Sequence, residues 1–419
     1  MLSDVLQEAA RRHAVPGAAA AVQFRGELTE AATGVLNLDT GVPATPDSLF
    51  QIGSVTKPWT ALLVTQLADE GLIDLDEPVR AYLPSFAVAD EQASRTITVR
   101  HLLTHTAGFH GDHFDDTGRG DDAVERYVTL LAEKGTRIAA PGALYSYNNA
   151  GFVVLGALVA RLRGGTWEDA VRERIGVRAA LFAEEALLSR VSAGHIRGAV
   201  STRWQMPRSG GPAGAVICAA PRELVRFGGL VPEAMTAAQV TIPGVPGRKA
   251  VRYGLGLALY DWAGARVFGH DGDTIGQAAT WRVLPDHDLS LAVCANGGRV
   301  PAFFDEVIDA VVRETAGLVV PPRPGPPAEP TGVDPASYAG RYEYPLYTYD
   351  VVVAGSGLDL TATPRGFNAA ALGSEPETIR FTHLAGDTFV TAEPHDGSYG
   401  TMTFVDGFLH DGRAVPKVT

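Results

Sequence analysis

Residues 50–57 read Phe-Gln-Ile-Gly-Ser-Val-Thr-Lys, and this stretch places the Ser54 hydroxyl three residues before the Lys57 amine. A helix-like run follows from Trp59 to Ala68, so both side chains are expected on one face of a helix. Serine is a weak nucleophile, and a partly buried lysine can act as its base. Free N–H groups of a first helical turn would also face a developing oxyanion. Because an S-x-x-K tetrad also occurs by chance, other motifs must decide its role.

Composition bounds the class of protein. The chain has 419 residues, of which 46% are hydrophobic and 20% are charged, as expected for a globular protein of two or three domains. Its formal net charge is -13, and no dense basic stripe offsets it, which argues against a nucleic-acid partner. The two cysteines, Cys218 and Cys294, lie in apolar runs and are interpreted as buried, reduced thiols.

The N-terminal residues 1–12 mix acidic and basic side chains on an amphipathic helix. They lack the basic region and apolar core of a secretory signal. No run approaches the roughly 20 apolar residues of a membrane span. We therefore expect a cytoplasmic protein without a membrane partner, unless a leader has been removed.

The first 318 residues predict a sheet interrupted by helices. Residues 17–24 and 28–36 predict a hairpin, and the helix from Ser54 is expected to end near Gly71. Helical stretches between polar and Gly-rich loops predict a helical subdomain over about residues 74–197; they include residues 121–134 and 150–161. Strand patterns joined by short connections then predict antiparallel neighbours, followed by a helix at 301–316; the strands are expected at 253–260, 266–269, 277–283 and 289–295.

A proline-rich segment from Pro321 to Pro330 predicts a stiff linker. We expect it to occupy residues 319–333, between a first domain of residues 1–318 and a second of residues 334–419. The second domain alternates short apolar strands with Gly and Asp turns, which predicts a small β barrel. Its strands are expected at residues 350–353, 358–363, 388–392 and 400–405.

Two further motifs give the tetrad its context. Tyr147-Asn148-Asn149 precedes an expected helix, and His270-Asp271-Gly272 ends an expected strand. In this order, S-x-x-K, Y-x-N and H-x-G resemble the motifs of penicillin-recognising serine hydrolases, specifically the class C β-lactamase-like branch with its esterases, D-aminopeptidases, amidases and DD-peptidases. The resemblance covers roughly residues 1–318. It implies an α/β (α+β) fold in which helices flank an antiparallel sheet and a helical subdomain is inserted.

The resemblance also implies catalytic roles. Ser54 would form a covalent acyl-enzyme. Lys57 and Tyr147 would share the proton transfers, with Tyr147 favoured as a phenolate by the nearby ammonium. Asn149 would hold Lys57 and the substrate amide by hydrogen bonds, and Asn148 is the alternative amide.

The third motif would add His270 to the catalytic residues and would shape the substrate side of the site. Backbone N–H groups of Ser54 and Asp273 would form the oxyanion hole, and Gly272 would leave room for substrate along the strand edge. Related penicillin-processing enzymes commonly have K-T-G here, whose lysine attracts a substrate carboxylate. His270 is largely neutral and lies beside Asp271 and Asp273. This favours esters, amides or substrates with a free amine over β-lactams.

No metal or cofactor is expected. His101 and His105 have the i, i+4 spacing of shared metal ligation, but without a third ligand they are interpreted as loop-structuring residues. The acidic stretch of residues 112–122 is interpreted as a solvated loop rather than a cation site; its members are Asp112, Asp115, Asp116, Asp121 and Asp122.

After the linker, Tyr338-Ala339-Gly340-Arg341-Tyr342 resembles the start of a lipocalin-like domain. Some family members carry one, including D-aminopeptidases, esterases and the penicillin-binding-protein-type thioesterases that cyclise nonribosomal peptides. We therefore expect a serine hydrolase or acyltransferase acting on a small ester, amide or peptide. One alternative releases or cyclises a peptidyl thioester, with a carrier-bound substrate. Another is a sensor that is acylated at Ser54 without turnover.

Overall fold

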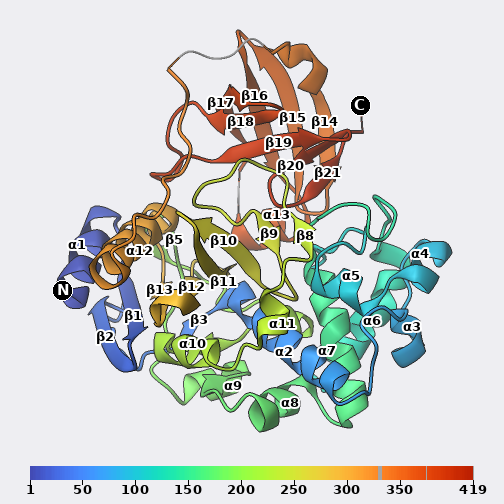
Figure 1. The fold of residues 1–419 in the computed structure, drawn as a ribbon, viewed down its shortest axis with the longest axis horizontal. Coiled ribbons are helices and arrows are strands. Elements are labelled where there is room, and N and C mark those ends of the chain that lie inside the picture. Colours follow the sequence, from blue (N-terminus) through green and yellow to red (C-terminus); the bar gives the residue numbers. More distant parts are fainter. Residues whose placement is uncertain (329–332, 374, 419) are drawn as a thin grey trace.

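The computed structural model describes residues 1–328, 333–373 and 375–418. An eight-stranded antiparallel sheet lies in its lower part in Figure 1, in the order β2-β1-β13-β12-β11-β10-β9-β8. Its strands are β1 (Gly17–Phe24), β2 (Glu27–Gly34), β8 (Val240–Thr241), β9 (Arg252–Tyr253), β10 (Ala258–Trp262), β11 (Ala265–Asp273), β12 (Ala278–Leu284) and β13 (Leu289–Ala295). β1 pairs with β13. The N-terminal hairpin therefore lies beside the strand that comes last in the chain order of this sheet.

Helices cover both faces of this sheet. One face packs against α1 (Leu2–Arg12) and α12 (Val300–Ala316), and α10 (Pro221–Gly228) lies on the other. A strand covered on both sides has no solvated face to mark with polar residues. β12 is accordingly buried at every position.

A group of helices lies beside the sheet, to the right in Figure 1. At its centre, α7 (Asn149–Arg163) is buried from Asn149 to Val159 and packs against α2 (Lys57–Asp69), which follows the short strand β3 (Phe50–Gln51). Further helices surround this pair: α3 (Val79–Tyr82), α4 (Glu91–Thr96), α5 (Val99–Leu103), α6 (Ala123–Lys134), α8 (Trp167–Arg174) and α9 (Ala183–Leu187). The two-residue strand β4 (Ala179–Ala180) is a small departure from an all-helical region.

A second eight-stranded antiparallel sheet forms the upper part of Figure 1, with its strands in chain order. A bridge between Tyr342 and Lys417 joins its first and last strands, so the sheet is a nearly closed barrel. The strands are β14 (Gly340–Tyr344), β15 (Tyr347–Ala354), β16 (Gly357–Pro364), β17 (Glu377–Ala385), β18 (Thr388–Thr391), β19 (Thr401–Val405), β20 (Phe408–His410) and β21 (Ala414–Pro416).

The predicted fold class is confirmed, with local differences. The strand expected at 253–260 is divided into β9 and β10 by a turn at Gly256, whose φ is +73° and whose added Cβ would lie 2.3 Å from Ala61 Cβ. Ser54 lies in a 3₁₀ turn (Gly53–Thr56), and the α-helix begins only at Lys57.

Three other expectations concern the linker, the two cysteines and a membrane-spanning helix. Residues 329–332 of the predicted linker lie outside the described residues, and the domain boundaries remain a prediction. Cys218 and Cys294 are buried free thiols. Among the described helices, none is long and apolar enough to cross a membrane.

Candidate active site

The 3₁₀ turn and α2 bring Ser54 and Lys57 together. Lys57 Nζ lies 2.9 Å from Ser54 Oγ and also donates a hydrogen bond to the Ala213 carbonyl at 2.9 Å. Lys57 is completely buried, and no described carboxylate forms an ion pair with it. The spacing of the S-x-x-K tetrad therefore produces a direct contact between hydroxyl and amine.

Burial lowers the pKa of Lys57 well below its usual value, and the nearby Arg413 cation acts in the same direction, whereas Asp112 opposes both. An isolated charge in a poorly solvated site is costly, so the neutral amine is favoured. A neutral amine has a lone pair free to take the Ser54 proton. This geometry suits a general base.

Tyr147 lies over the same site. Its ring centroid is 4.9 Å from Lys57 Nζ and 4.3 Å from the His105 ring. Its hydroxyl is buried and has no hydrogen-bond partner of acceptable geometry among the described residues. Burial raises the pKa of Tyr147, and the adjacent Ser54 hydroxyl offsets this only in part. The expectation of a resting phenolate is therefore wrong, because desolvation outweighs both the Ser54 hydroxyl and the Arg413 charge.

His270 belongs to a directed chain of hydrogen bonds. The Asn148 N–H donates to His105 Nδ1 at 3.0 Å, which leaves His105 Nε2 to donate to the Tyr253 hydroxyl at 3.2 Å. That hydroxyl donates to His270 Nε2 at 3.1 Å, and His270 Nδ1 donates to the Asp271 carbonyl at 2.6 Å. Burial and Lys57 lower the pKa of His270 to about 4. His270 is thus a neutral, fixed side chain.

The two expected oxyanion donors lie side by side. A Cβ added to Gly272 would lie 2.6 Å from Ser54 N, and one added to Gly53 would lie 2.7 Å from Asp273 N. The end of β11 therefore packs directly against the turn that carries Ser54. A Cβ added to Gly272 would also meet the Ile52 carbonyl at 2.1 Å, so packing against this turn by itself requires glycine here.

The Y-x-N motif divides its two amides between structure and site. The Asn148 side chain caps α7 by accepting from Gly151 N, and its amide group donates to the Phe109 carbonyl. Asn149 instead lines the cavity and donates to Asp112 Oδ1 at 2.6 Å. No hydrogen bond from Asn149 to Lys57 is present in the described structure, contrary to expectation, because Lys57 points at Ser54 and Ala213.

The acidic stretch after His110 is not a single solvated loop. Asp112 is only 4% exposed, and its carboxylate is bound by Asn149 and by the Arg413 guanidinium. Other acidic members pair with Lys134, Arg208 and Arg126. The interpretation as a solvated loop is therefore wrong for Asp112.

The two histidines that suggested a metal site have separate structural roles. His101 completes the capping box of α5 with Thr98, and His105 joins the chain through Tyr253. Within the described residues no group of three or more His, Cys, Asp or Glu side chains is placed to hold a metal ion.

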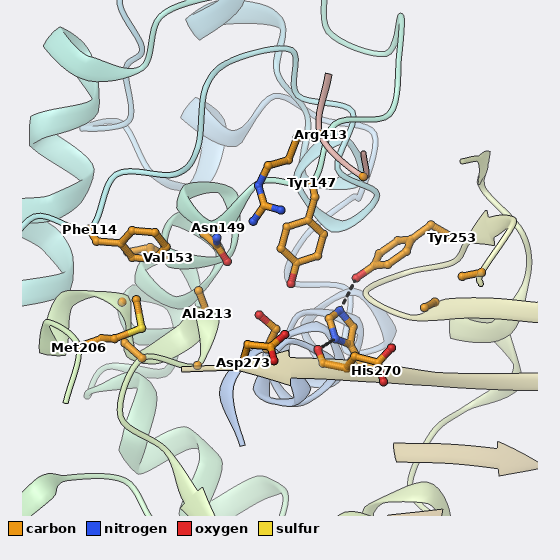
Figure 2. A pocket seen from close by; sticks show the side chains of 18 of the residues that line it. Phe114, Tyr147, Asn149, Val153, Met206, Ala213, Tyr253, His270, Asp273 and Arg413 are labelled. Carbon is orange, nitrogen blue, oxygen red and sulfur yellow. Dashed lines mark hydrogen bonds between the residues drawn. The ribbon is translucent and has the colours of Figure 1, made fainter. Parts of the chain in front are cut away.

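The pKa values of the two carboxylates beside His270 are shifted in opposite directions. Burial acts to raise the pKa of Asp271, but Arg282 and Thr280 bind the carboxylate and bring its pKa below the usual value. Burial and the Asp271 charge raise the pKa of Asp273 to about 6. Asp273 lines the cavity opposite Tyr147 (Figure 2), and it is the one of the pair without an arginine bound to it among the described residues.

A cavity of about 360 Å³ opens over Ser54. Figure 2 shows two sides to it, a polar one carrying Tyr147, His270 and Asp273, and an apolar one. The apolar side is formed by Phe114, Val153, Met206 and Ala213. Such a division suits a substrate with an apolar side chain next to a reacting polar group.

Two cavity residues escaped the sequence reasoning, Tyr253 and Arg413. Tyr253 was assigned to a strand, and nothing in the local pattern marks its hydroxyl. Arg413 comes from the turn after β20 in the barrel, 301 residues from its partner Asp112. It adds a cation to a rim that was expected to be acidic.

This fold agrees with the comparisons with known proteins. A protein-family model described as Beta-lactamase matches residues 2–315, and the chain belongs to that family of serine hydrolases. Penicillin-binding protein 4 of Amycolatopsis lactamdurans is 40% identical over 360 residues, which cover 79% of this chain and 94% of that protein. Esterase EstB of Burkholderia gladioli is 36% identical over 178 residues, covering 39% of this chain and 45% of the esterase.

Among solved structures, SurE has a TM-score of 0.77 and 28% sequence identity, with 100% of this chain and 98% of that chain covered. The similarity therefore includes the C-terminal barrel. A structure of SurE with D-Leu is also similar, with a TM-score of 0.74, 26% identity and the same coverage.

Proposed function

We propose that this protein is an acyl-transfer enzyme that takes an acyl group from an ester, amide or thioester onto Ser54 and passes it to water or an amine. The observation that carries the proposal is the 2.9 Å contact between Ser54 Oγ and a buried Lys57 amine whose pKa is held low. A base that is neutral near physiological pH is what serine acylation needs.

In the acylation step, Ser54 Oγ attacks the acyl carbonyl while its proton moves to Lys57 Nζ. The carbonyl oxygen becomes an oxyanion beside the N–H groups of Ser54 and Asp273. Tyr147 then donates its phenolic proton to the departing alcohol, thiol or amine as the old acyl bond breaks. Lys57 returns the proton to Tyr147, so both groups are neutral again when the acyl-enzyme is complete.

Deacylation reverses these transfers. The incoming water or amine loses a proton to Lys57 as it attacks the acyl carbonyl, and the bond to Ser54 Oγ breaks. Ser54 recovers a proton from Lys57, and the product leaves as an acid or an amide. His270 takes no proton in this scheme, since its pKa of about 4 and its two hydrogen bonds keep it neutral; it supports the β11 edge.

We further propose that the acyl residue is an apolar D-amino acid. SurE, which is similar over the whole chain, has been solved with D-Leu. The apolar side of the cavity, with Val153 and Met206, would accept the side chain, and Asp273 would face a free ammonium group. Neutral His270 in the place of a lysine leaves less attraction for the carboxylate of a β-lactam.

A second candidate is transfer of a peptidyl group from a carrier-bound thioester to an amine, including cyclisation. Arg413 and Gly412 of the barrel line the cavity, and a covered acyl-enzyme reacts less readily with water. The carrier-bound substrate would be the partner in that case.

A product-resolved assay tests these proposals. The panel pairs D- and L-leucyl esters and anilides with a peptidyl thioester and a cephalosporin, and intact-mass spectrometry follows the adduct on Ser54. We expect faster acylation by the D-leucyl ester than by the L-form, and products that show whether water or an amine is the acceptor. An adduct that never leaves would identify a sensor, and cephalosporin turnover at the ester rate would contradict the substrate assignment.

Ser54→Ala should remove the adduct and the activity. Ser189→Ala, which changes an exposed serine, is the matched control. Full activity in Ser54→Ala would overturn the mechanism.

A further inference from the structure

The turn between β20 and β21 in the C-terminal barrel touches the segment that carries Tyr147. His410 Nε2 donates to the Tyr145 carbonyl at 2.9 Å, and the Tyr147 N–H donates to the Gly412 carbonyl at 3.0 Å. Ala414 N donates to Ser146 Oγ at 3.1 Å. Each of three consecutive residues around the phenol is therefore held by this turn, which we define as residues 410–414.

Arg413, at the middle of the 410–414 turn, makes two further contacts. Its guanidinium carbon lies 5.1 Å from the centre of the Tyr147 ring, and the group forms an ion pair with Asp112. Figure 2 shows it beside Tyr147 and Asn149. Because Asp112 also accepts from Asn149 at 2.6 Å, one arginine is connected to both Tyr147 and Asn149, the first and last residues of the Y-x-N motif.

The segment around Tyr147 has no helix or strand hydrogen bonds to hold it. Residues 145–148 lie in neither helix nor strand, and the Tyr147 hydroxyl has no acceptable hydrogen-bond partner among the described residues. On the opposite side, His105 accepts from Asn148 N and its carbonyl accepts from Ser146 N at 2.8 Å. Buried backbone groups of an irregular segment need such partners, and the barrel supplies those for Tyr145 and Tyr147.

We propose that the 410–414 turn is a positioning element of the acyl-transfer site, in which Arg413 acts through Tyr147 and Asp112. The turn holds the phenol over Ser54, and the guanidinium fixes both the ring and, through Asp112, the Asn149 amide. The inference rests on the proposed function, because it assumes that Tyr147 transfers a proton. It gives the C-terminal barrel a part in catalysis.

The charge of Arg413 also sets the electrostatic balance of the site. Arg413 lowers the pKa of both Tyr147 and Lys57, whereas Asp112 raises both. Without the arginine, Asp112 remains uncompensated, the pKa of Lys57 rises, and less of it is neutral at a given pH. Activity would then need a higher pH. The other titratable or charged groups around Tyr147 are Tyr145, His105, His270, Tyr253 and, across the cavity, Asp273.

Three variants of the full-length protein test the proposal with the D-leucyl ester. Arg413→Gln should lower kcat by about 10- to 100-fold with little change in KM, and it should move the acid limb of the kcat profile to higher pH. Arg413→Lys should bring the acid limb of the kcat profile most of the way back to the wild-type pH, because the positive charge is present again. Ser146→Ala removes one acceptor and should lower kcat by about threefold without moving the limb.

Arg380→Gln is the matched control, since Arg380 is an exposed barrel arginine paired with Asp359. Active-site titration by intact mass corrects every rate for the folded fraction, and if Arg413→Gln does not fold, Arg413→Lys and Ser146→Ala carry the test. A rise in KM alone would make Arg413 a substrate contact and overturn the inference, as would unchanged kinetics in all three variants or an equal loss in Arg380→Gln.

Tyr147→Phe and Ser54→Ala separate this inference from the proposed function. If both are inactive while the Arg413 variants behave as wild type, only the positioning role fails. If Tyr147→Phe and Ser54→Ala are active, the proposed function fails.

Discussion

Two basic side chains, one buried and one half-buried, approach Tyr147 from different regions of the molecule. Lys57 comes from the start of α2 and lies 4.9 Å from the ring centre, and Arg413 comes from the 410–414 turn and lies 5.1 Å away. Lys57 has no ion-pair partner in the described structure, whereas Arg413 binds Asp112. Lys57 and Arg413 thus lie at similar distances from the Tyr147 ring, but only Arg413 has a carboxylate beside it among the described residues.

The difference shows how pairing decides the use of a buried cation. An ammonium group without a counter-ion loses its proton when desolvated, and the pKa of Lys57 is accordingly low. A guanidinium group stays charged in proteins and needs a carboxylate when buried. Lys57 is therefore suited to move a proton, and Arg413 is suited to hold its neighbours in place.

The largest effect is expected from Lys57→Arg, which replaces the proposed base with a permanent cation. Arginine cannot be neutral near pH 7, so acylation should slow by about 10³- to 10⁴-fold. Stopped-flow measurement of ester acylation checks this, with Lys134→Arg as the control on an exposed lysine paired with Asp115. A variant within tenfold of wild type would break the comparison, because the charge alone would then suffice.

Asp112→Asn tests the ion pair that Arg413 forms with Asp112. It leaves the Arg413 charge half-buried without a counter-ion, and we expect about 2 kcal/mol less free energy of unfolding. Urea denaturation measures this loss. Asp121→Asn, an exposed acidic residue paired with Arg208, should leave the urea midpoint near that of wild type. Equal stabilities of the Asp112 and Asp121 variants would show that the ion pair does not hold the barrel turn in place.

Tyr253→Phe extends the test to neutral buried groups. It leaves His105 Nε2 and His270 Nε2 without their shared partner, and we expect a loss of about 1 to 2 kcal/mol in the free energy of unfolding. Thermal unfolding followed by circular dichroism checks it, beside Tyr347→Phe on the barrel. A stability unchanged by Tyr253→Phe would argue against the directed chain of hydrogen bonds.

The smallest effect concerns Asp273 and pH. Its pKa is raised to about 6, so the carboxylate is present above that pH and is protonated as the pH falls through it. For an ester with a free amine, KM should therefore rise about tenfold between pH 7 and pH 5. An ester without an amine should show no such rise, and Asp273→Asn should remove it. A rise that persists in Asp273→Asn would assign the titration to another group.

Local patterns accounted for much of the fold and of the proposed chemistry. Ser54 and Lys57 are three residues apart, so their contact follows from one turn of backbone. The strands of the central sheet and the helix after Asn149 were visible as apolar runs, because both are buried on nearly all sides.

The errors came from groups whose surroundings are assembled by distant segments. Asp112 reads as one member of an acidic loop, and only its contacts with Asn149 and Arg413 show that it is buried. The expected phenolate at Tyr147 failed for the same reason. A pKa depends on solvation and on every nearby charge. The three residues of a motif determine neither of these.

The sequence by itself determined the contact between Ser54 and Lys57, the proposed nucleophile and base, since the geometry of one turn brings them together. Only the tertiary structure decided which of these groups are charged and what holds Tyr147 in place. Burial lowers the pKa of Lys57, and a turn of the C-terminal barrel brings Arg413 across 301 residues of chain to Asp112. Such a contact depends on packing between two sheets, and no local spacing encodes it.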